Sequence, residues 1–324
     1  SVPRNLSVNT QKSIDAWTQL AKKIGVDLRT GTKGERLLYD GKAKRICGVR
    51  LSSKAGVKNV EAKDGVVIAT GGFARNKALL EKYVPRMKNA STICAMGCDG
   101  DGLKMALAYG ADVADMPYIK ATFAFNLKAT SIKDACWVFR DGAIVLNKEG
   151  KRFVEELERR DVMSKAILEQ TGKYCYALFN QAVEDRAHAI EHHQDEVRVF
   201  SKTGILKTGK TLDEVAAAFD IPADALKATV ARVNEFAKTG KDLDFGYRGK
   251  FSDLSEGPYW IYRGVPSVHH TMGGLKINPK AQVLDKNDKP IPGLWAAGEV
   301  TGGLHGTNRV GGNAIPDALG NGQK

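Results

Sequence analysis

The chain has 324 residues, of which 43% are hydrophobic and 27% charged, and it contains 34 glycines. This composition is typical of one large or two medium globular α/β domains and excludes a disordered chain. The formal net charge is +12, but the basic residues are scattered without interleaved aromatic residues, which argues against nucleic-acid binding. No apolar run approaches the roughly 18 residues of a membrane helix. The five cysteines have the spacing of neither a disulfide framework, a CxxC metal site nor a CxxCH haem site.

The beginning of the chain predicts a helix followed by short strands. Apolar side chains recur at helical spacing over residues 10–24, and Gly25 ends that helix. A strand is expected at Val26–Leu28. The alternating segments 35–51 and 56–69 are typical of strands in one small sheet.

Two glycine loops follow these strands. Gly65–Ala69 is expected to be a buried strand that stops at Gly71 and Gly72. The next loop, GCDGDG, precedes a helix, and the N-terminus of a helix is a natural anion site. Asp101 and Gly102 are therefore either cofactor contacts or an ordinary Asp/Gly turn that caps the helix.

The character of the chain changes near residue 117. Residues 117–262 mix strands and helices, and two of these helices are well defined. One spans 211–219 and begins with a capping box, and the other spans 222–237 with one apolar face. We expect 117–262 to be an inserted α+β capping domain between two parts of a cofactor domain, 1–116 and 263–324.

One fragment of this middle region has the pattern of a phosphate-binding loop. Residues 204–211, GILKTGKT, satisfy G-x-x-x-x-G-K-[ST]. However, no strand runs straight into Gly204, and no apolar strand ending in Asp follows as a magnesium partner. A phosphate-loop NTPase is therefore the weaker interpretation, and a lead-in to a capped helix is the stronger one.

The densest motif lies near the C-terminus. The apolar run Leu294–Ala297 stops at Gly298 and Glu299, and a buried strand that ends in this way can bind a ribose through the carboxylate. Polar side chains then interrupt a glycine-rich stretch: His305, Asn308, Arg309 and Asn313. This mixture favours a backbone wrapped around a flat, polar cofactor over a surface loop.

Three segments resemble one known family. HHTMGG (269–274), AAGEVTGGLHGTNRVGGNA (296–314) and VVIATGGFARN (66–76) resemble the flavoprotein subunit of the fumarate reductase/succinate dehydrogenase superfamily, especially the soluble flavocytochrome-c-type fumarate reductases. The resemblance covers nearly the whole chain. It implies an α/β fold, with a doubly wound, Rossmann-like FAD-binding domain and an inserted capping domain. The family opens with a GxGxxG unit that holds the FAD diphosphate, which does not occur here, so we expect a longer protein whose FAD-binding domain is incomplete at the N-terminus of this chain.

The resemblance implies which residues contact FAD. The implied contacts are Gly71, Gly72, Asp101, Gly102, Met272, Gly273, Gly298, Glu299, Asn313, Ala314 and Ile315. Glu299 should bind the ribose, and Met272 and Gly273 should touch the isoalloxazine. The helix that begins at Asn313 should direct its positive N-terminus towards the flavin's pyrimidine end.

The resemblance also implies a reaction. These enzymes reduce an activated C=C bond: a hydride moves from flavin N5 to one carbon, and a side chain protonates the other. The implied proton donor is Arg160, although an arginine normally keeps its proton, with a pKa above about 12. Without the resemblance, Arg159 and Arg160 would be interpreted as surface arginines paired with Glu155 and Glu156.

The implied substrate site is cationic. His270 and Arg309 should clamp substrate oxygens, with Thr122 and Thr271 as further substrate contacts. The family's dicarboxylate reductases carry a histidine where Thr122 stands, and their Thr-Glu pair is missing here. Several aromatic residues are expected to line the wall instead: Phe123, Phe125, Trp137 and Phe139. These departures favour an arylacrylate or urocanate-like acid, or an enone, over fumarate.

The implied partners are a small unsaturated acid or enone and an electron donor outside this chain, which could be a haem, an FMN module or an NADH-linked module. No metal ion is expected. A cofactor-free fragment or binding module with the same fold is the main alternative to an enzyme. Dehydrogenation is also open, because hydride transfer runs in both directions.

Overall fold

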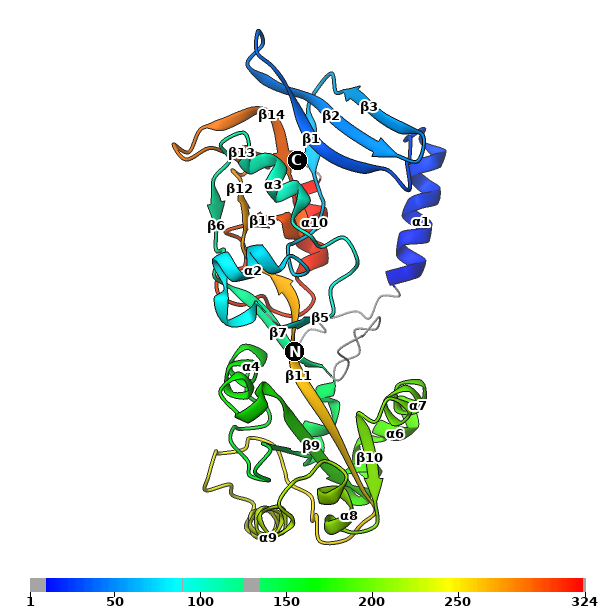
Figure 1. The fold of residues 1–324 in the computed structure, drawn as a ribbon, viewed down its shortest axis with the longest axis vertical. Helices are drawn as coiled ribbons and strands as arrows, with labels where there is room; N and C mark the ends of the chain where they lie inside the picture. Colours follow the sequence, from blue (N-terminus) through cyan, green and yellow to red (C-terminus); the bar gives the residue numbers. More distant parts are fainter. Residues whose placement is uncertain (1–9, 89, 125–134, 323–324) are drawn as a thin grey trace. The chain divides into compact units, whose positions relative to one another are not determined.

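The computed structural model describes residues 10–88, 90–124 and 135–322 (Figure 1). The contacts divide the chain into two compact units. The first unit comprises residues 1–73, 100–116 and 272–324, and the second comprises residues 74–99 and 117–271. Residues 74–99 and 263–271, which the sequence analysis assigned to the cofactor domain, thus make their contacts within the second unit.

The first unit is built from small sheets and short helices. Its elements are α1 (Thr10–Lys23), β1 (Lys33–Asp40), β2 (Arg45–Ser53), β3 (Gly56–Glu61), β4 (Val66–Ile68), α3 (Asp101–Leu107), β6 (Val113–Ala114), β12 (Gly274–Lys276), β13 (Gln282–Leu284), β14 (Pro290–Ala296), η4 (Gly298–Val300), β15 (Thr301–Gly302) and α10 (Ala314–Gly322). Its sheets have the strand orders β1-β2-β3, β15-β12-β6 and β13-β14-β4. Strands β4 and β14 are parallel, and so are β12 and β15.

The predicted strands of this unit are only partly confirmed. Segment 35–51 and the first half of 56–69 form the antiparallel sheet β1-β2-β3. Strand β4, however, pairs with β14 in another sheet. The expectation that Gly65–Ala69 is a buried strand was wrong in part, because β4 spans only Val66–Ile68 and Val67 is 62% exposed. Among the described residues, strand β4 pairs on one side only, with β14.

The predicted first helix is confirmed, but the strand after it is not. Helix α1 spans Thr10–Lys23, and its apolar residues Trp17 and Leu20 are about half exposed. The expected strand Val26–Leu28 is wrong, since this stretch belongs to no strand and both its apolar side chains are exposed. Strands need a hydrogen-bonding neighbour, and the three residues after the turn at Gly25 (φ +85°) pair with no strand among the described residues.

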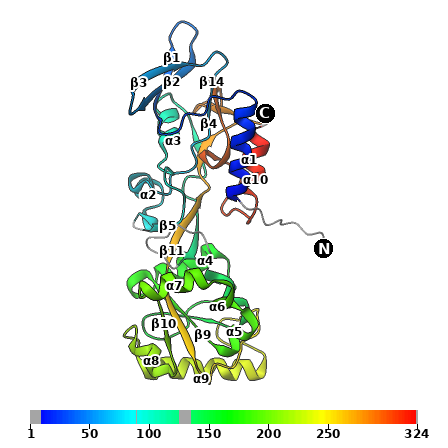
Figure 2. The same ribbon diagram turned by 90° about the vertical axis from the view of Figure 1, so that its right-hand side faces the viewer.

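The second unit is organised around one long strand. Its elements are α2 (Lys77–Tyr83), η1 (Pro85–Met87), β5 (Ser91–Thr92), β7 (Ile119–Ala124), η2 (Ala135–Asp141), β8 (Ile144–Leu146), α4 (Arg160–Leu168), η3 (Thr171–Lys173), β9 (Cys175–Asn180), α5 (Gln181–Ala187), α6 (Ala189–His192), α7 (Gln194–Lys202), β10 (Leu206–Gly209), α8 (Leu212–Ala217), α9 (Ala223–Thr239) and β11 (Tyr259–Thr271). The first half of β11 pairs with β9 and β10, and its second half pairs with β5 and β7 (Figures 1 and 2).

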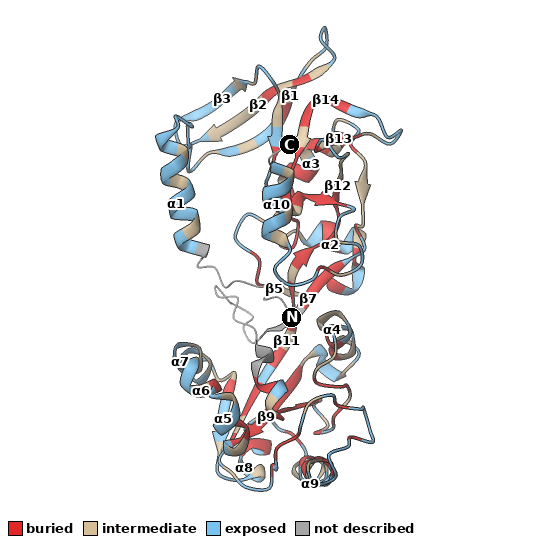
Figure 3. Ribbon diagram, turned by 180° about the vertical axis from the view of Figure 1, so that it is seen from behind, coloured by how far each residue is buried: buried red, intermediate tan, exposed pale blue. Residues whose placement is uncertain are grey.

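A single hydrophobic core holds this unit together. Every residue of β9 is buried, and Leu226, Val230, Val233 and Phe236 of α9 are buried in the same core (Figure 3). These four residues recur at helical spacing, so one face of α9 removes its apolar area from water at roughly 1.5–3 kcal/mol per large side chain. The predicted helix over 222–237 is thus confirmed.

The predicted capped helix is confirmed as α8. The Thr211 hydroxyl accepts a hydrogen bond from the Glu214 amide at 3.2 Å. The Glu214 carboxylate reaches back to the Lys210 amide at 2.7 Å. The first bond satisfies an amide that the first turn of the helix leaves without a backbone partner, and the second bond ties the residue before the N-cap to the helix. In the part of the chain that the structure describes, none of the helices has both the length and the apolar character needed to cross a membrane.

Candidate functional site

In the first unit, the glycine motifs converge at the carboxyl ends of the parallel strands β4 and β14. The Ala297 amide donates to the Ile68 carbonyl at 3.0 Å and so continues the pairing one residue beyond β14. Gly298 then turns the chain with φ +77°, and Glu299 lies in the short helix η4. The crevice beyond the carboxyl ends of parallel strands is the usual nucleotide site of α/β sheets.

The second glycine loop packs onto the first. The Gly100 amide donates to the Gly72 carbonyl at 3.1 Å, and Gly71 has φ +74°. A Cβ added at Gly102 would lie 2.3 Å from Thr70 Oγ1 and 2.4 Å from Ile68 Cγ2. Glycine at position 102 therefore allows α3 to approach the end of β4 closely.

Asp101 faces lysines on the surface of the first unit. Its carboxylate lies 2.7 Å from Lys104 Nζ and 3.3 Å from Lys33 Nζ. The hydrogen bond from Lys104 lowers the pKa of Asp101. The N-cap of α3 is Gly100, not Asp101, so a simple aspartate cap does not describe this turn. A role for Asp101 in cofactor binding stays a prediction.

Met272 and Gly273 lie where backbone segments approach closely. Met272 is 1% exposed. A Cβ at Gly273 would lie 2.3 Å from Met116 Cα, and one at Gly274 would lie 2.2 Å from the Val300 carbonyl oxygen. Both glycines are therefore explained by packing within the first unit, and flavin contacts at Met272 and Gly273 remain predictions.

The helix predicted to begin at Asn313 is confirmed as α10. The Asp317 amide donates to the Asn313 carbonyl at 3.1 Å, and Ala314 and Ile315 form the start of the first turn. His305 Nε2 lies 3.2 Å from Asp317 Oδ2, with both side chains largely buried, so His305 connects the glycine loop to the helix. Arg309 is 6% exposed and donates to the Val310 carbonyl at 3.1 Å.

The glycine loop between β15 and α10 meets the requirements of a site for a flat cofactor. Gly306 and Gly311 have open space where a Cβ would be, so their backbone is accessible. Leu304, Val310 and Ile315 expose 58%, 70% and 43% of their surface. Accessible backbone amides beside exposed apolar side chains suit a ring system that has polar edges and apolar faces. The residues of the first unit therefore fit FAD.

In the second unit, Arg160 is the first residue of helix α4. Its neighbour Arg159 is exposed and pairs with Asp161 at 2.7 Å. For Arg159, the interpretation that it pairs with Glu155 or Glu156 is not borne out, because its partner is Asp161. Those two carboxylates pair instead with other arginines of the unit, at residues 248 and 152.

Ion pairs fix the segment that leads to Arg160. Arg152 donates to Glu156 at 2.7 and 2.8 Å and to Asp242 at 2.8 and 3.2 Å. Burial raises the pKa of Glu156. Although burial also acts on Asp242, the hydrogen bonds from Arg152 and from two backbone amides lower the pKa of Asp242 to about 2. Glu155 accepts hydrogen bonds from the Arg248 amide at 3.0 Å and the Arg248 side chain at 2.8 Å.

His270 and Thr271 end the long strand β11. They are 4% and 0% exposed. The pairing with β7 shifts between Val268 and His270, which makes His269 the extra residue of a β-bulge. Thr122 is paired with Ser267 in the backbone register, but its side chain lies outside the described residues.

The expected aromatic wall is only partly described. Phe125 lies outside the described residues, as do the side chains of Phe123 and Trp137. Phe139 is 0% exposed and belongs to the hydrophobic core of the second unit. Its sequence signal, an aromatic residue in an apolar run, does not distinguish a binding wall from a core position.

The phosphate-loop pattern of residues 204–211 forms a different structure. Leu206–Gly209 is strand β10, antiparallel to β11, and the Lys210 amide donates to Glu214 as part of the α8 cap. A strand in this position leaves no loop to surround a phosphate. The structure therefore supports the capped-helix interpretation of this fragment.

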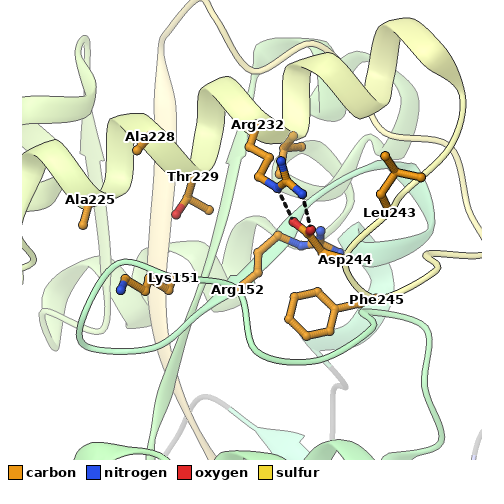
Figure 4. A pocket seen from close by; sticks show the side chains of 10 residues that line it. Lys151, Arg152, Ala225, Ala228, Thr229, Arg232, Leu243, Asp244 and Phe245 are labelled. Carbon is orange, nitrogen blue, oxygen red and sulfur yellow. Dashed lines mark hydrogen bonds and ion pairs between the residues drawn. The ribbon is translucent and has the colours of Figure 1, made fainter.

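A hollow of about 580 Å³ lies elsewhere in the second unit, between α9 and the loop after it (Figure 4). Its walls are mostly apolar and include Leu243 and Phe245. Arg232 and Asp244 close one side with hydrogen bonds of about 2.6 Å. None of the predicted site residues lines this hollow.

Comparisons with known proteins agree with this description. A family model described as an FAD binding domain matches residues 2–315. A fumarate reductase (cytochrome) of Shewanella frigidimarina is 40% identical over 301 residues, which are 92% of this chain and 51% of that protein. A urocanate reductase of Eggerthella lenta is 38% identical over 291 residues, which are 89% of this chain and 48% of that protein.

Solved structures give the same result. The open conformation of a flavocytochrome c3 fumarate reductase matches this chain with a TM-score of 0.84 and 34% sequence identity, covering 99% of this chain and 55% of that one. The chain therefore spans about half the length of the curated relatives it matches.

Proposed function

The chain belongs to the FAD binding domain family, and from this premise we propose that it carries the flavin and substrate residues of an oxidoreductase acting on C=C bonds. The substrate class is an unsaturated carboxylate or enone. The observation that carries the proposal is the convergence of Ile68, Gly72, Gly102 and Ala297 at the ends of two parallel strands in the first unit. That arrangement is suited to a dinucleotide.

The cofactor is held by residues of the first unit. Glu299 accepts hydrogen bonds from the ribose hydroxyls, and Gly298 leaves room for the sugar. The positive N-terminal end of α10 favours negative charge on the flavin's pyrimidine ring. When bound, FAD supplies the hydride that is added to the alkene.

The protein supplies the proton and the charge stabilisation. His270 and Arg309 donate hydrogen bonds to the carboxyl or carbonyl oxygens of the substrate, where negative charge develops as the alkene is reduced. Arg160 holds a proton on its guanidinium and delivers it to the second alkene carbon. An arginine can act in this way only if the proton is replaced afterwards from neighbouring groups or solvent.

The position of Arg160 supports this role. It begins α4 directly after a segment that Glu155 and Glu156 fix through buried and partly buried ion pairs. A fixed acid loses little entropy when it donates its proton.

For the substrate, we infer an unsaturated acid or enone other than fumarate. The two relatives are named a fumarate reductase and a urocanate reductase, so both classes occur among similar proteins. Thr122 replaces a histidine of the dicarboxylate reductases, and the Thr-Glu pair is missing. An arylacrylate or a urocanate-like acid suits these replacements better. The electron donor is a haem, FMN or NADH-linked module outside this chain.

The proposal is tested on the full-length protein. Its absorption spectrum should show bound flavin, and a reduced dye should be reoxidised in the presence of cinnamate, urocanate or acrylate. A full-length protein without flavin would support the cofactor-free alternative instead. Fumarate as much the best substrate would contradict the inferred substrate class.

A further inference from the structure

Strand β7 carries a buried lysine that the roles assigned above do not use. Lys120 is 6% exposed and is the one buried lysine in the described part of the chain. Lysines are almost never buried unless the ammonium is paired, and Lys120 takes part in at least one hydrogen bond or other electrostatic or ring contact. The available sequence signal was a lysine at an alternating position in the strand-like run YIKATFA.

The register of the sheet places Lys120 beside His270. The two residues are direct partners in the antiparallel pairing of β7 with β11. Directly opposed residues of an antiparallel pair point to the same face of the sheet, with their Cβ atoms about 4.5–5.5 Å apart. The ammonium and the imidazole therefore share one face within the second unit.

Side chains on the opposite face of β7 line a cavity beside helix α4. Ile119 and Ala121 line a cavity of about 280 Å³ together with Val162 and Leu168 of α4. The same cavity is also lined by Arg86, Asp161 and Lys165. Since side chains alternate along a strand, Lys120 points away from this cavity.

Ser267 adds an acceptor and donor to the polar face. It pairs with Thr122 in the register, two residues along β7 from Lys120. Ser267 is 0% exposed, and its hydroxyl has no hydrogen-bond partner among the described residues. A buried hydroxyl without a partner costs about 1–3 kcal/mol, so this face is suited to a polar ligand.

We propose that Lys120 is a substrate-binding residue that, with His270 and Ser267, binds the carboxylate of the substrate and makes the enzyme select acids over neutral enones and amides. This inference rests on the proposed function and narrows its substrate class. A carboxylate has two oxygens and about four acceptor sites, enough for an ammonium, an imidazole and a hydroxyl. A neutral amide of the same acid offers one carbonyl oxygen and no charge.

The test compares acids with their amides. The full-length wild-type protein and the variants Lys120→Gln, Lys120→Met and Lys120→Arg are assayed with cinnamate against cinnamamide and with acrylate against acrylamide. Binding of the saturated acid 3-phenylpropanoate is measured by calorimetry, independently of turnover. Lys207→Gln, on the exposed side of β10 in the same unit, is the matched control.

Loss of one charge-assisted hydrogen bond should weaken acid binding about tenfold or more. Lys120→Gln and Lys120→Met should therefore raise KM for the acids and Kd for 3-phenylpropanoate by about that factor, and change KM for the amides less than about twofold. Lys120→Arg should keep the preference for acids, and Lys207→Gln should match the wild type.

Other outcomes overturn the inference or the function separately. If Lys120→Gln has the same KM for the acids as the wild type, Lys120 does not bind the carboxylate. If the substitution raises KM for acids and amides by the same factor, that role is also overturned. Either result leaves the proposed reductase activity intact. Failure of both neutral variants to fold would show that the lysine is structural, which also overturns it. Acid binding that depends on Lys120 in a protein that reduces none of the four alkenes would contradict the proposed function alone. A wild type that neither binds nor reduces the acids would overturn both.

Discussion

Arg152 Nη2 donates to Asp242 Oδ2 at 2.8 Å and joins two segments that are 90 residues apart in the sequence. The side chains are 4% and 1% exposed. Glu156 completes the group from the other side of the guanidinium. Three charges in one buried group stabilise the fold only while every partner is present, because the desolvation cost of each is offset by the others.

Removing one carboxylate from this group should therefore destabilise the second unit. Asp242→Asn leaves Arg152 with one carboxylate and weakens the bonds to the Asp244 and Tyr247 amides. We expect a loss of about 3 kcal/mol in the free energy of unfolding, measured by chemical denaturation. Asp244→Asn is the matched control, because its partner Arg232 is exposed and exposed pairs contribute little. Equal effects of the two substitutions would contradict this account.

The same group should shape the response to acid. The pKa of Asp242 is about 2 in the folded protein, below the value of about 3.9 in an unfolded chain. Its contribution to stability is therefore complete above about pH 4 and is lost as the pH falls towards 2. Between pH 4 and pH 2, the wild type should lose more stability than Asp242→Asn, as followed by denaturation at each pH. Glu156 has the opposite effect on the pH dependence of stability: burial raises its pKa, so its titration favours the folded state as the pH falls. Parallel curves for the two proteins would exclude Asp242 as a source of acid sensitivity.

The proton-donor assignment predicts different results for adjacent arginines. Arg160→Ala should lower kcat by roughly 10²–10⁴, the usual contribution of a general acid, and change the Kd of 3-phenylpropanoate little. Arg159→Ala should leave kcat near the wild-type value, because this side chain is exposed and pairs with Asp161. Steady-state assays with the acid substrates measure both. Full activity of Arg160→Ala would exclude Arg160 as the acid.

The sequence was informative where the signal was local. Helices α8 and α9 were predicted from a cap and an apolar face, and the glycine motifs carried a resemblance that the family match confirms. That resemblance, and not the glycine spacing alone, implied FAD as the cofactor. Local patterns could not show that β4 pairs with β14, more than 200 residues away, and so lies apart from β1–β3.

The sequence also could not show which charged side chains form ion pairs with each other. Glu155 and Glu156 are close in sequence to Arg159 and Arg160, yet their partners are Arg152 and Arg248. Lys120 gave only an ambiguous signal, because its position beside His270 depends on the register of two strands about 150 residues apart and on a bulge at His269. Such registers are set by tertiary packing and turn geometry.

The close approach at Gly102 provides a test of the cofactor crevice that does not depend on the catalytic residues. Alanine at this position would favour the helix α3 by its intrinsic propensity, so any loss must come from the clash with Ile68 and Thr70 at 2.4 and 2.3 Å. We expect Gly102→Ala to lower the free energy of unfolding by about 1–3 kcal/mol and to reduce the flavin content of the full-length protein, measured by absorption. Gly34→Ala is the control, because a Cβ there meets its nearest neighbour, Met105, at an ordinary 3.6 Å. Normal flavin content in Gly102→Ala would mean that the end of β4 does not shape the cofactor site.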